Sequence, residues 1–571
     1  MRKLALGLIL SAALATVSQQ TAQACGGFFC SQVQVDQTAE RIIFALGPNK
    51  VTAYIQINYQ GEAKKFSWVV PVLAQPTIKL GSQSTFTIME QLTRPQFNLD
   101  YSGIAGGSCF QFPLAGNAQD AAAGPPNDKG VEVLDVKQVG PFDTVVLKSK
   151  STTELVAWLT ANGYDQPPSS TPLIDYYVKQ GMLFVAVKLT KSASVGEIAP
   201  LALEMDTPEA CVPLILTQIA AVPNMPVVVY VLGNGRAFPK NWFHVDMDYA
   251  QVNWLQNGSN YMAMATAAID EAAGHGFITE FAGASTIAKG QLFQPGRFST
   301  AGLVGVTDPS DVLDQLLQAG FPRDASMQAL LREFIPEPAE LVAQGVDERT
   351  FYNSIAQYEP QLNGFKVDSV GLVKALEDRL ITPLKEAQAL FDEHPFLTRL
   401  MSTVSPSEMN RDPLFLLNPD LPAVSNVHTA KVSGMCSATN GQISNMKLTL
   451  EDGQVLSLGT TSLFGGGTPW MFETKVPRTK SIELVGPAGM PVKIRRTEVK
   501  RIDEELNKDA AEVVRGRVIA DNANQPAAPV AALNDDSGCS CSLHRQTSAS
   551  ALSVFALFGV ALLRVSRRKR R

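Results

Sequence analysis

Five ionisable side chains near the middle of the sequence are of the kinds that coordinate metal ions. His244, Asp246 and Asp248 occupy alternate positions, so on a β-strand they would share one face. His275 and Glu280 follow further along the chain. Imidazole and carboxylate groups together suit zinc or a harder cation, which supports the hypothesis of a metal-dependent hydrolase. The simpler interpretation is a solvated strand face and a turn at a helix end, because nothing in the spacing brings the two groups together.

Signatures of nucleophilic catalysis are missing from the sequence. No Gly-x-Ser-x-Gly elbow is present, and of the five histidines His394 precedes a proline and His544 lies near the C-terminus. Cys436 would need an activated thiol, and its nearest histidine along the chain is His428. We therefore predict no catalytic residue and no cofactor.

The seven cysteines are too few for a disulfide-built scaffold, but they can form structural disulfides in an exported protein. If Cys25 pairs with Cys30 and Cys109 pairs with Cys211, then Cys436 is free. If Cys25 carries a lipid, the other four could all pair, and the sequence alone does not choose. A structural disulfide is favoured over redox or metal use of the first pair, since metal-binding pairs usually come with a second pair.

The N-terminus has the three parts of a secretory signal. Arg2 and Lys3 precede an apolar core over residues 4–15, and an Ala-Gln-Ala motif ends at Ala24, directly before Cys25. We predict a signal peptide over residues 1–24 that is recognised by the export machinery and removed by signal peptidase. Lipid attachment to Cys25 is the alternative, because lipoprotein processing needs a cysteine at the first mature position.

The charge distribution excludes one class of partner. The chain of 571 residues has a formal net charge of -6, but residues 1–24 carry +2 and residues 545–571 carry +7, so the exported body carries -15. Phosphate binding needs a basic face, and the basic cluster lies at the C-terminus. We therefore expect no nucleic-acid partner. Apolar residues make up 45% of the chain, which is typical of buried cores rather than disorder.

The first half of the body has the pattern of mixed strands and helices. Apolar and polar residues alternate over 51–59, which predicts a half-buried strand, and 66–70 continues a β-meander. Residues 103–129 are rich in Gly, Ala, Pro and Asn and predict a long loop. Ser151 and Glu154 form a capping-box pattern at the start of a helix. Residues 259–273 predict a further helix.

The second half changes character twice. A helical subdomain is expected over residues 305–404, where Val312, Leu313, Leu316 and Leu317 form one apolar stripe. Residues 397–400 lead from helix into irregular chain, and Arg399 could form a structural ion pair with Glu408 or Asp412. A mostly β module with an irregular lead-in is expected over 405–520. A flexible spacer with a cysteine pair follows over 521–544.

The C-terminal tail, residues 545–571, has the pattern of a membrane segment. The 18 uncharged residues between Arg545 and Arg564 would span roughly 27 Å as a helix, just short of the hydrocarbon thickness of a bilayer. The Arg and Lys cluster after them would stay cytoplasmic by the positive-inside rule. We therefore predict a C-terminal membrane helix that leaves the body outside the inner membrane, at the cell envelope or cell surface.

This tail resembles a known sorting signal. The Gly-Cys-Ser-Cys motif at 538–541, the apolar helix and the terminal Arg cluster are similar to the myxobacterial sorting tail called MYXO-CTERM. The resemblance implies a temporary anchor that a membrane-embedded sortase-like protease removes, with Cys539 or Cys541 as the site of processing and lipid attachment. A permanent tail anchor with two incidental cysteines is the alternative.

The start of the body carries a second resemblance. The Cys-Gly-Gly-Phe-Phe-Cys motif at 25–30, residues 35–44, and the Trp-Val-Val-Pro motif at 68–71 are similar to domain-of-unknown-function family 2330. The resemblance covers roughly residues 25–300. It implies a bacterial secreted or cell-surface setting and no particular reaction.

Together these patterns predict an α+β fold. It would have a β-rich N-terminal α+β domain over 25–300, a helical middle subdomain, a small β-rich C-terminal module and a single C-terminal membrane helix. The leading hypothesis is an exported, surface-anchored bacterial protein with a non-enzymatic binding or envelope-structural role, held to the membrane by its helix or a lipid. The alternative is the surface hydrolase built on the five metal-type side chains.

Overall fold

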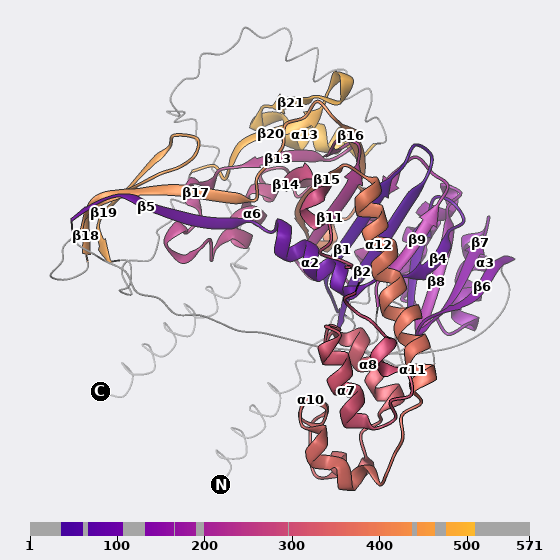
Figure 1. Ribbon diagram of the computed structural model, residues 1–571. Helices are drawn as coiled ribbons and strands as arrows, with labels where there is room; N and C mark the ends of the chain where they lie inside the picture. The colour runs from indigo at the N-terminus through magenta and orange to yellow at the C-terminus, as the bar shows by residue number, and fades with distance from the viewer. Residues whose placement is uncertain are drawn as a thin grey trace, which may run out of the picture. The chain divides into compact units, whose positions relative to one another are not determined.

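The computed structural model (Figure 1) describes residues 36–60, 67–106, 132–164, 166–189, 199–294, 296–436, 442–462 and 476–508. Several predicted features lie outside these ranges, namely the signal peptide, the spacer, the C-terminal tail, Cys25, Cys30, Cys109, Cys539 and Cys541. Within the described ranges, no helix has the length and apolar character needed to cross a membrane.

A ten-stranded mixed sheet is the main element of the fold. The pairs β1–β11 and β13–β14 are parallel, and the other neighbours are antiparallel. The strands lie in the order β21 (Pro491–Ile494), β20 (Thr479–Val485), β13 (Phe243–Met247), β14 (Gly276–Ala284), β15 (Phe396–Val404), β11 (Met225–Gly233), β1 (Asp36–Leu46), β2 (Val51–Gln60), β9 (Leu201–Met205) and β4 (Thr77–Leu80).

Both faces of this sheet are buried near its middle. On β1, Ile42 and Phe44 belong to one apolar core, whereas Ile43 and Ala45 belong to a second core on the opposite face. This follows from the alternation of side chains along a strand. The second core also receives helices α2 (Gln83–Thr93), α6 (Tyr261–Asp270) and α13 (Arg496–Leu506).

Three smaller sheets complete the β structure. The first has the order β3 (Ser67–Val72), β8 (Leu183–Leu189), β7 (Phe142–Lys148), β6 (Glu132–Val139), and its core includes α3 (Thr152–Ala161), α4 (Thr171–Lys179) and α5 (Leu214–Thr217). The second has the order β10 (Ala210–Cys211), β16 (Leu414–Asn418), β12 (Arg236–Pro239). The third has the order β19 (Val455–Ser462), β18 (Gln442–Thr449), β17 (Val427–Cys436), β5 (Gln96–Gly106).

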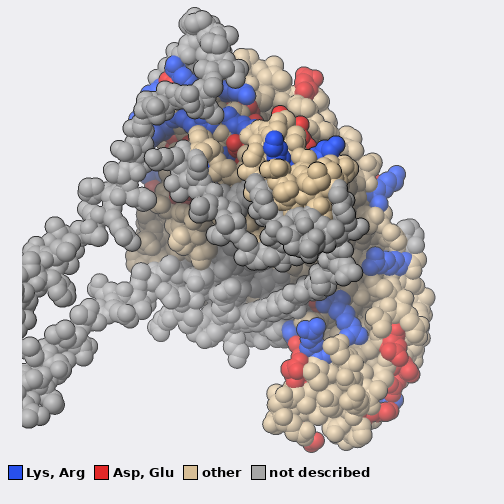
Figure 2. Space-filling model, turned by 90° about the vertical axis from the view of Figure 1, so that its left-hand side faces the viewer, with Lys and Arg blue, Asp and Glu red and all other residues tan. Residues whose placement is uncertain are grey.

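Residues 309–393 form a helical segment with a core of its own. Val312, Leu313 and Leu316 are buried as predicted, but Leu317 is 61% exposed because it lies one position off the apolar face. The lower part of Figure 2, which holds this segment, carries acidic and basic side chains close together. The helices are α7 (Pro309–Gln318), α8 (Ala325–Phe334), α9 (Ala339–Ala343), α10 (Glu348–Asn353), α11 (Ser369–Leu376) and α12 (Thr382–Glu393).

The ten-stranded sheet divides the chain differently from the predicted boundaries. β15 falls inside the predicted helical subdomain, yet it pairs with β11 and β14 at the centre of the sheet. β20 falls in the predicted C-terminal module, yet it pairs with β13. Residues 397–400 are therefore part of a buried central strand and not irregular chain. The sheet is assembled from segments on both sides of residues 300 and 404.

Candidate functional site

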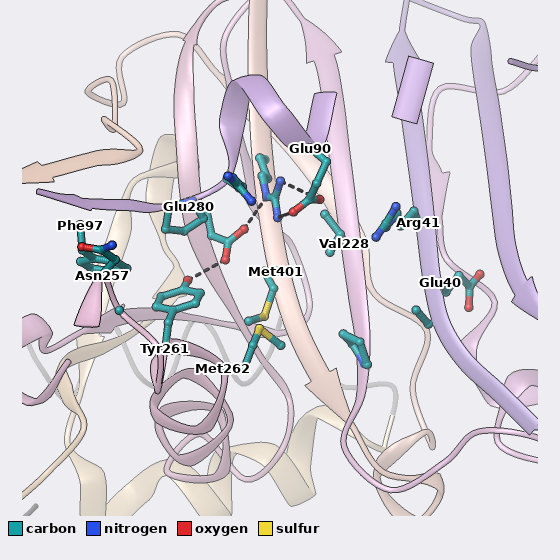
Figure 3. Close-up of a pocket in the computed structure, with 16 residues that line it drawn as sticks. Glu40, Arg41, Glu90, Phe97, Val228, Asn257, Tyr261, Met262, Glu280 and Met401 are labelled. Carbon is teal, nitrogen blue, oxygen red and sulfur yellow. Dashed lines mark hydrogen bonds and ion pairs between the residues drawn. The ribbon is translucent and has the colours of Figure 1, made fainter. Parts of the chain in front are cut away.

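A cavity of about 340 Å³ opens on the face of the ten-stranded sheet that carries the second core (Figure 3). Its floor comes from β1, β11, β15 and β14, and its walls from α2, the start of β5 and the first residues of α6. The size lies in the range of small-molecule sites. The lining residues are Ala39, Glu40, Arg41, Glu90, Arg94, Pro95, Phe97, Pro226, Val228, Asn257, Gly258, Tyr261, Met262, Glu280, Arg399 and Met401.

Strand register explains which side chains reach this cavity. Arg41 on β1 lies opposite Val228 on β11, and Val228 lies opposite Met401 on β15, so the three share one face. Glu40 precedes Arg41 and therefore belongs to the other face. Figure 3 shows the two side chains leaving β1 in opposite directions, with Arg41 on the side of Val228 and Glu90.

Arg399 is the centre of the polar network in the cavity. Its Nε donates to Glu280, while Nη1 and Nη2 donate to the two carboxylate oxygens of Glu90 at 3.0 and 3.1 Å. Nη1 also lies 3.2 Å from the hydroxyl of Tyr230 and 3.4 Å from that of Thr93. Arg399 is 4% exposed and Glu280 is 1% exposed. The planar guanidinium thus joins two carboxylates that come from β14 and α2.

All four carboxylate oxygens in this network have donors. Tyr261 donates its hydroxyl to Glu280 Oε1 at 2.6 Å, and Tyr230 donates to Glu90 Oε2 at 3.2 Å. Burial would raise the pKa of Glu90, but the charge and hydrogen bonds of Arg399 outweigh it and hold that pKa below its ordinary value. Burial and the Glu280 carboxylate raise the pKa of Tyr261 well above its ordinary value. Glu90 is therefore an ionised partner of Arg399 at neutral pH.

Two further arginines line the cavity without a carboxylate partner. Arg41 is half-buried and Arg94 is exposed, and neither forms an ion pair with another described residue. The charge of Arg41 still acts through space, because it lowers the pKa of Glu90. The wall of the cavity therefore carries positive charge that the described part of the protein leaves unpaired.

An aromatic cluster holds one wall in place. Phe97 packs edge-on against Trp254 at 5.3 Å between ring centroids, lies 5.6 Å from Tyr261, and stacks on His428 at 5.3 Å. Gly258, with φ of +75°, approaches Phe97 so closely that an added Cβ would lie 2.3 Å from Cδ2 of the ring. The turn before α6 thus needs glycine both for its backbone conformation and for space.

Of the three alternate residues, His244 and Asp246 lie on β13 and Asp248 directly follows it, and together they do not form the solvated face expected from the sequence. His244 is 7% exposed, and it lies 3.1 Å from Glu483 through Nδ1 and 3.0 Å from Thr279 through Nε2. Burial raises the pKa of Asp246. Asp248 accepts a hydrogen bond from the backbone N–H of Ala250. The pairing of β13 with β14 and β20 buries this region, which an alternating pattern alone does not reveal.

His275 and Glu280 belong to two other networks. His275 follows the end of α6, as predicted, but it is buried, with Nδ1 2.9 Å from Asp503 and Nε2 2.7 Å from the carbonyl of Glu408. Glu280 lines the cavity instead. Across the described ranges there is no group of three or more His, Cys, Asp or Glu placed to hold a metal ion. The structure thus does not gather the five predicted metal-type side chains into one group.

The structure defines the state of two cysteines in the body of the protein. Cys211 is a free thiol, and its burial raises its pKa well above the ordinary value. Cys436 is bonded in a disulfide. This differs from the arrangement in which Cys211 pairs with Cys109 and Cys436 is free.

The sequence analysis named Glu280 as a metal-type side chain and Arg399 as half of an ion pair, but it did not single out Arg41, Glu90 or Arg94. Arg399 does not pair with Glu408 or Asp412, as considered above, but with Glu280 and Glu90. The available signal was a charged residue inside an otherwise apolar run. Arg399 lies between Leu397 and Leu400, next to Thr398, and Arg41 directly precedes the apolar run that begins at Ile42. Lysine and arginine are almost never fully buried unless paired, so each such interruption indicates a site or a buried ion pair.

Comparison with known proteins relates the chain to one family. Neither curated proteins nor solved structures yield a match. Residues 19–294 match the model of DUF2330, which is described as an uncharacterised protein conserved in bacteria. The match includes four of the five residues that shape the polar part of the cavity, namely Arg41, Glu90, Arg94 and Glu280, whereas Arg399 lies beyond it. Residues 19–294 are thus similar to DUF2330, in agreement with the resemblance given above for roughly residues 25–300.

Proposed function

We propose that the protein is an exported bacterial surface protein that binds a small ligand in the cavity around Arg399 and has no catalytic role. The observation that carries the proposal is the combination of a cavity of about 340 Å³ with buried, fully hydrogen-bonded polar groups at its base. A site with rigid polar groups and an apolar wall is suited to bind and orient a small molecule.

The state of the two carboxylates favours binding over acid–base catalysis. A general acid or base needs a pKa near the working pH and a free oxygen that faces the substrate. Both oxygens of Glu280 and both oxygens of Glu90 already accept hydrogen bonds from Arg399, Tyr261 or Tyr230. The carboxylates therefore serve to hold the guanidinium in a fixed position at the base of the cavity.

A neutral fluorescent probe tests the binding role. N-phenyl-1-naphthylamine is expected to bind the full chain at one saturable site. Met262 lines the cavity and is 47% exposed, so Met262→Trp should fill the site without unfolding the protein and abolish binding. Leu317→Trp, at a 61% exposed position on α7, is the matched control and should bind the probe like the wild type. Equal probe binding by the two variants would refute the proposal.

The export and anchoring part of the proposal rests on the two ends of the sequence. The charged start, apolar core and Ala-Gln-Ala motif before Cys25 support export. The uncharged stretch and terminal basic cluster support insertion of the tail, followed by removal near Cys539 or Cys541 and attachment of lipid. Intact-mass analysis of the protein from its cell envelope tests this part. We expect a chain that starts at Cys25 and ends near the cysteine pair, and a full-length chain would refute it.

A further inference from the structure

We infer that the ligand of this cavity is a small anion with an apolar body, whose charged group is held by Arg41 and Arg94. The inference rests on the proposed binding role of the cavity and specifies the chemistry of its ligand. The evidence for it is that some charged side chains of the cavity wall form ion pairs with one another and others do not.

The charge balance of the cavity favours an anion over a cation. Apart from Glu40, which points away from the cavity, three arginines and two glutamates line it. Arg399 engages both glutamates in hydrogen bonds, and their remaining oxygen positions are occupied by tyrosine hydroxyls. A cationic ligand would have to compete with Arg399 for these carboxylates. An anion meets Arg41 and Arg94, which make no ion pair with another described residue.

The start of α6 adds to this preference. Tyr261 and Met262 are the first two residues of the ten-residue helix, and both line the cavity. The first N–H groups of a helix have no partner within the helix, and they give this end a partial positive charge. The side chain of Asn260, which precedes the helix, accepts no hydrogen bond from these groups, although the N–H of Tyr261 donates to the carbonyl of Gly258 at 2.8 Å. The positive end of the helix dipole thus adds to the field of the two arginines.

The remaining wall is apolar and adaptable. Met401 and Val228 form the floor, Phe97 forms one side, and Met262 is a large apolar residue that remains 47% exposed at the cavity. Methionine side chains are flexible and polarizable, so they adjust to the shape of an apolar group. Covering these residues would remove apolar surface from water, which stabilises a complex in proportion to the area covered. The ligand therefore needs an apolar body as well as a negatively charged group.

Four probes with the same eight-carbon chain separate the possible charges. Octanoate and octyl phosphate carry a negative group, octylammonium carries a positive group, and octanol is neutral. Each is titrated against the full chain loaded with N-phenyl-1-naphthylamine. We expect octanoate to displace this neutral probe at a concentration at least about tenfold lower than octanol or octylammonium, since hydrogen bonds to charged groups are stronger than neutral ones. The ranking of octanoate against octyl phosphate then distinguishes a carboxylate ligand from a phosphate ligand.

Arginine variants link the preference to its residues. Arg41→Gln should weaken displacement by octanoate about tenfold and leave octanol within twofold of the wild type. Arg94→Gln is the second variant, because Arg94 is exposed and its replacement does not disturb the core. Arg349→Gln makes the same charge change at an exposed residue of α10 and should have no effect on displacement by octanoate.

Different results would overturn the binding role of the cavity and its preference for anions. If the naphthylamine probe does not bind, the proposed binding role of the cavity is wrong. If it binds, but octanol and octylammonium displace it as well as octanoate does, the cavity binds ligands and the anion inference is wrong. An unchanged response of both Arg41→Gln and Arg94→Gln to octanoate would also overturn the inference.

Discussion

Replacement of Arg399 by methionine should be among the most destabilising single changes in the sheet. The side chain of Arg399 is 5% exposed and that of its partner Glu280 is 1% exposed, whereas that of Glu90 is 31% exposed. Arg399→Met would leave Glu280 buried with the hydroxyl of Tyr261 as its remaining donor, while water could solvate Glu90. Removal of one partner from a buried ion pair typically costs about 3–5 kcal/mol, because the other charge stays buried and unpaired.

A double-mutant cycle tests the cause of this loss. If the cost comes from the orphaned charge of Glu280, then Glu280→Gln in the Arg399→Met background should recover part of the stability. We expect a coupling free energy of about 1–3 kcal/mol between the two changes. Urea unfolding of the full-length variants, followed by circular dichroism, gives the free energies of unfolding.

An exposed ion pair supplies the matched control. Arg379 pairs with Glu333 on the helical segment, and their side chains are 37% and 48% exposed. Arg379→Met should cost at most about 1 kcal/mol, because solvent screens such pairs. Similar losses for Arg379→Met and Arg399→Met, or additive losses for Arg399→Met and Glu280→Gln, would refute the reasoning.

Three other changes have defined outcomes. Gly258→Ala should lower the free energy of unfolding by about 1–3 kcal/mol and weaken probe binding, because φ is +75° and the new methyl group would meet Phe97. Unchanged probe binding in the fluorescence titration would contradict this prediction. Burial lowers the pKa of His428 in the folded protein. Its contribution to stability is therefore present above the pKa of the unfolded state and is lost as pH falls through the pKa of the folded state. His428→Phe should flatten the decrease of the melting temperature below about pH 6.5, and an unchanged pH profile would contradict this prediction. Burial raises the pKa of Asp412 to about 7 in the folded protein. Its contribution to stability is therefore full below the pKa of the unfolded state and is lost as pH rises through the pKa of the folded state. Asp412→Asn should reduce the loss of stability between about pH 4 and 7, and melting temperatures that fall as steeply as those of the wild type would exclude this role.

Local patterns predicted several elements of the fold well. The alternation over residues 51–59 matches β2, and the predicted helix over 259–273 contains α6. Ser151 accepts a hydrogen bond from the backbone N–H of Glu154 at 3.3 Å at the start of α3, as the capping pattern predicts. These features depend on residues within a few positions of each other, so they are visible in the sequence itself.

The cavity could not be predicted in the same way. Arg399 lies 119 residues from Glu280 and 309 residues from Glu90, and strand register across the sheet brings them together. The run from Phe396 to Met401 is short and apolar apart from Thr398 and Arg399, so its pattern does not distinguish a central strand from the end of a helix. The sequence analysis did not identify helix α2, which carries Glu90, because two of its four buried residues are threonines and no clear apolar stripe marks its buried face.

The position of β15 has a consequence for how this protein folds. β11 and β14 are separated by the width of one strand, and the segment that fills this gap begins at Phe396, after the whole helical segment. Until β15 arrives, both neighbours present unpaired N–H and C=O groups, which are templates for pairing with other chains. Contacts between residues so distant in sequence also form slowly. A nascent or truncated chain that stops before Phe396 therefore has two open edges in its main sheet and is expected to aggregate, so the helical segment must be made before the sheet can close.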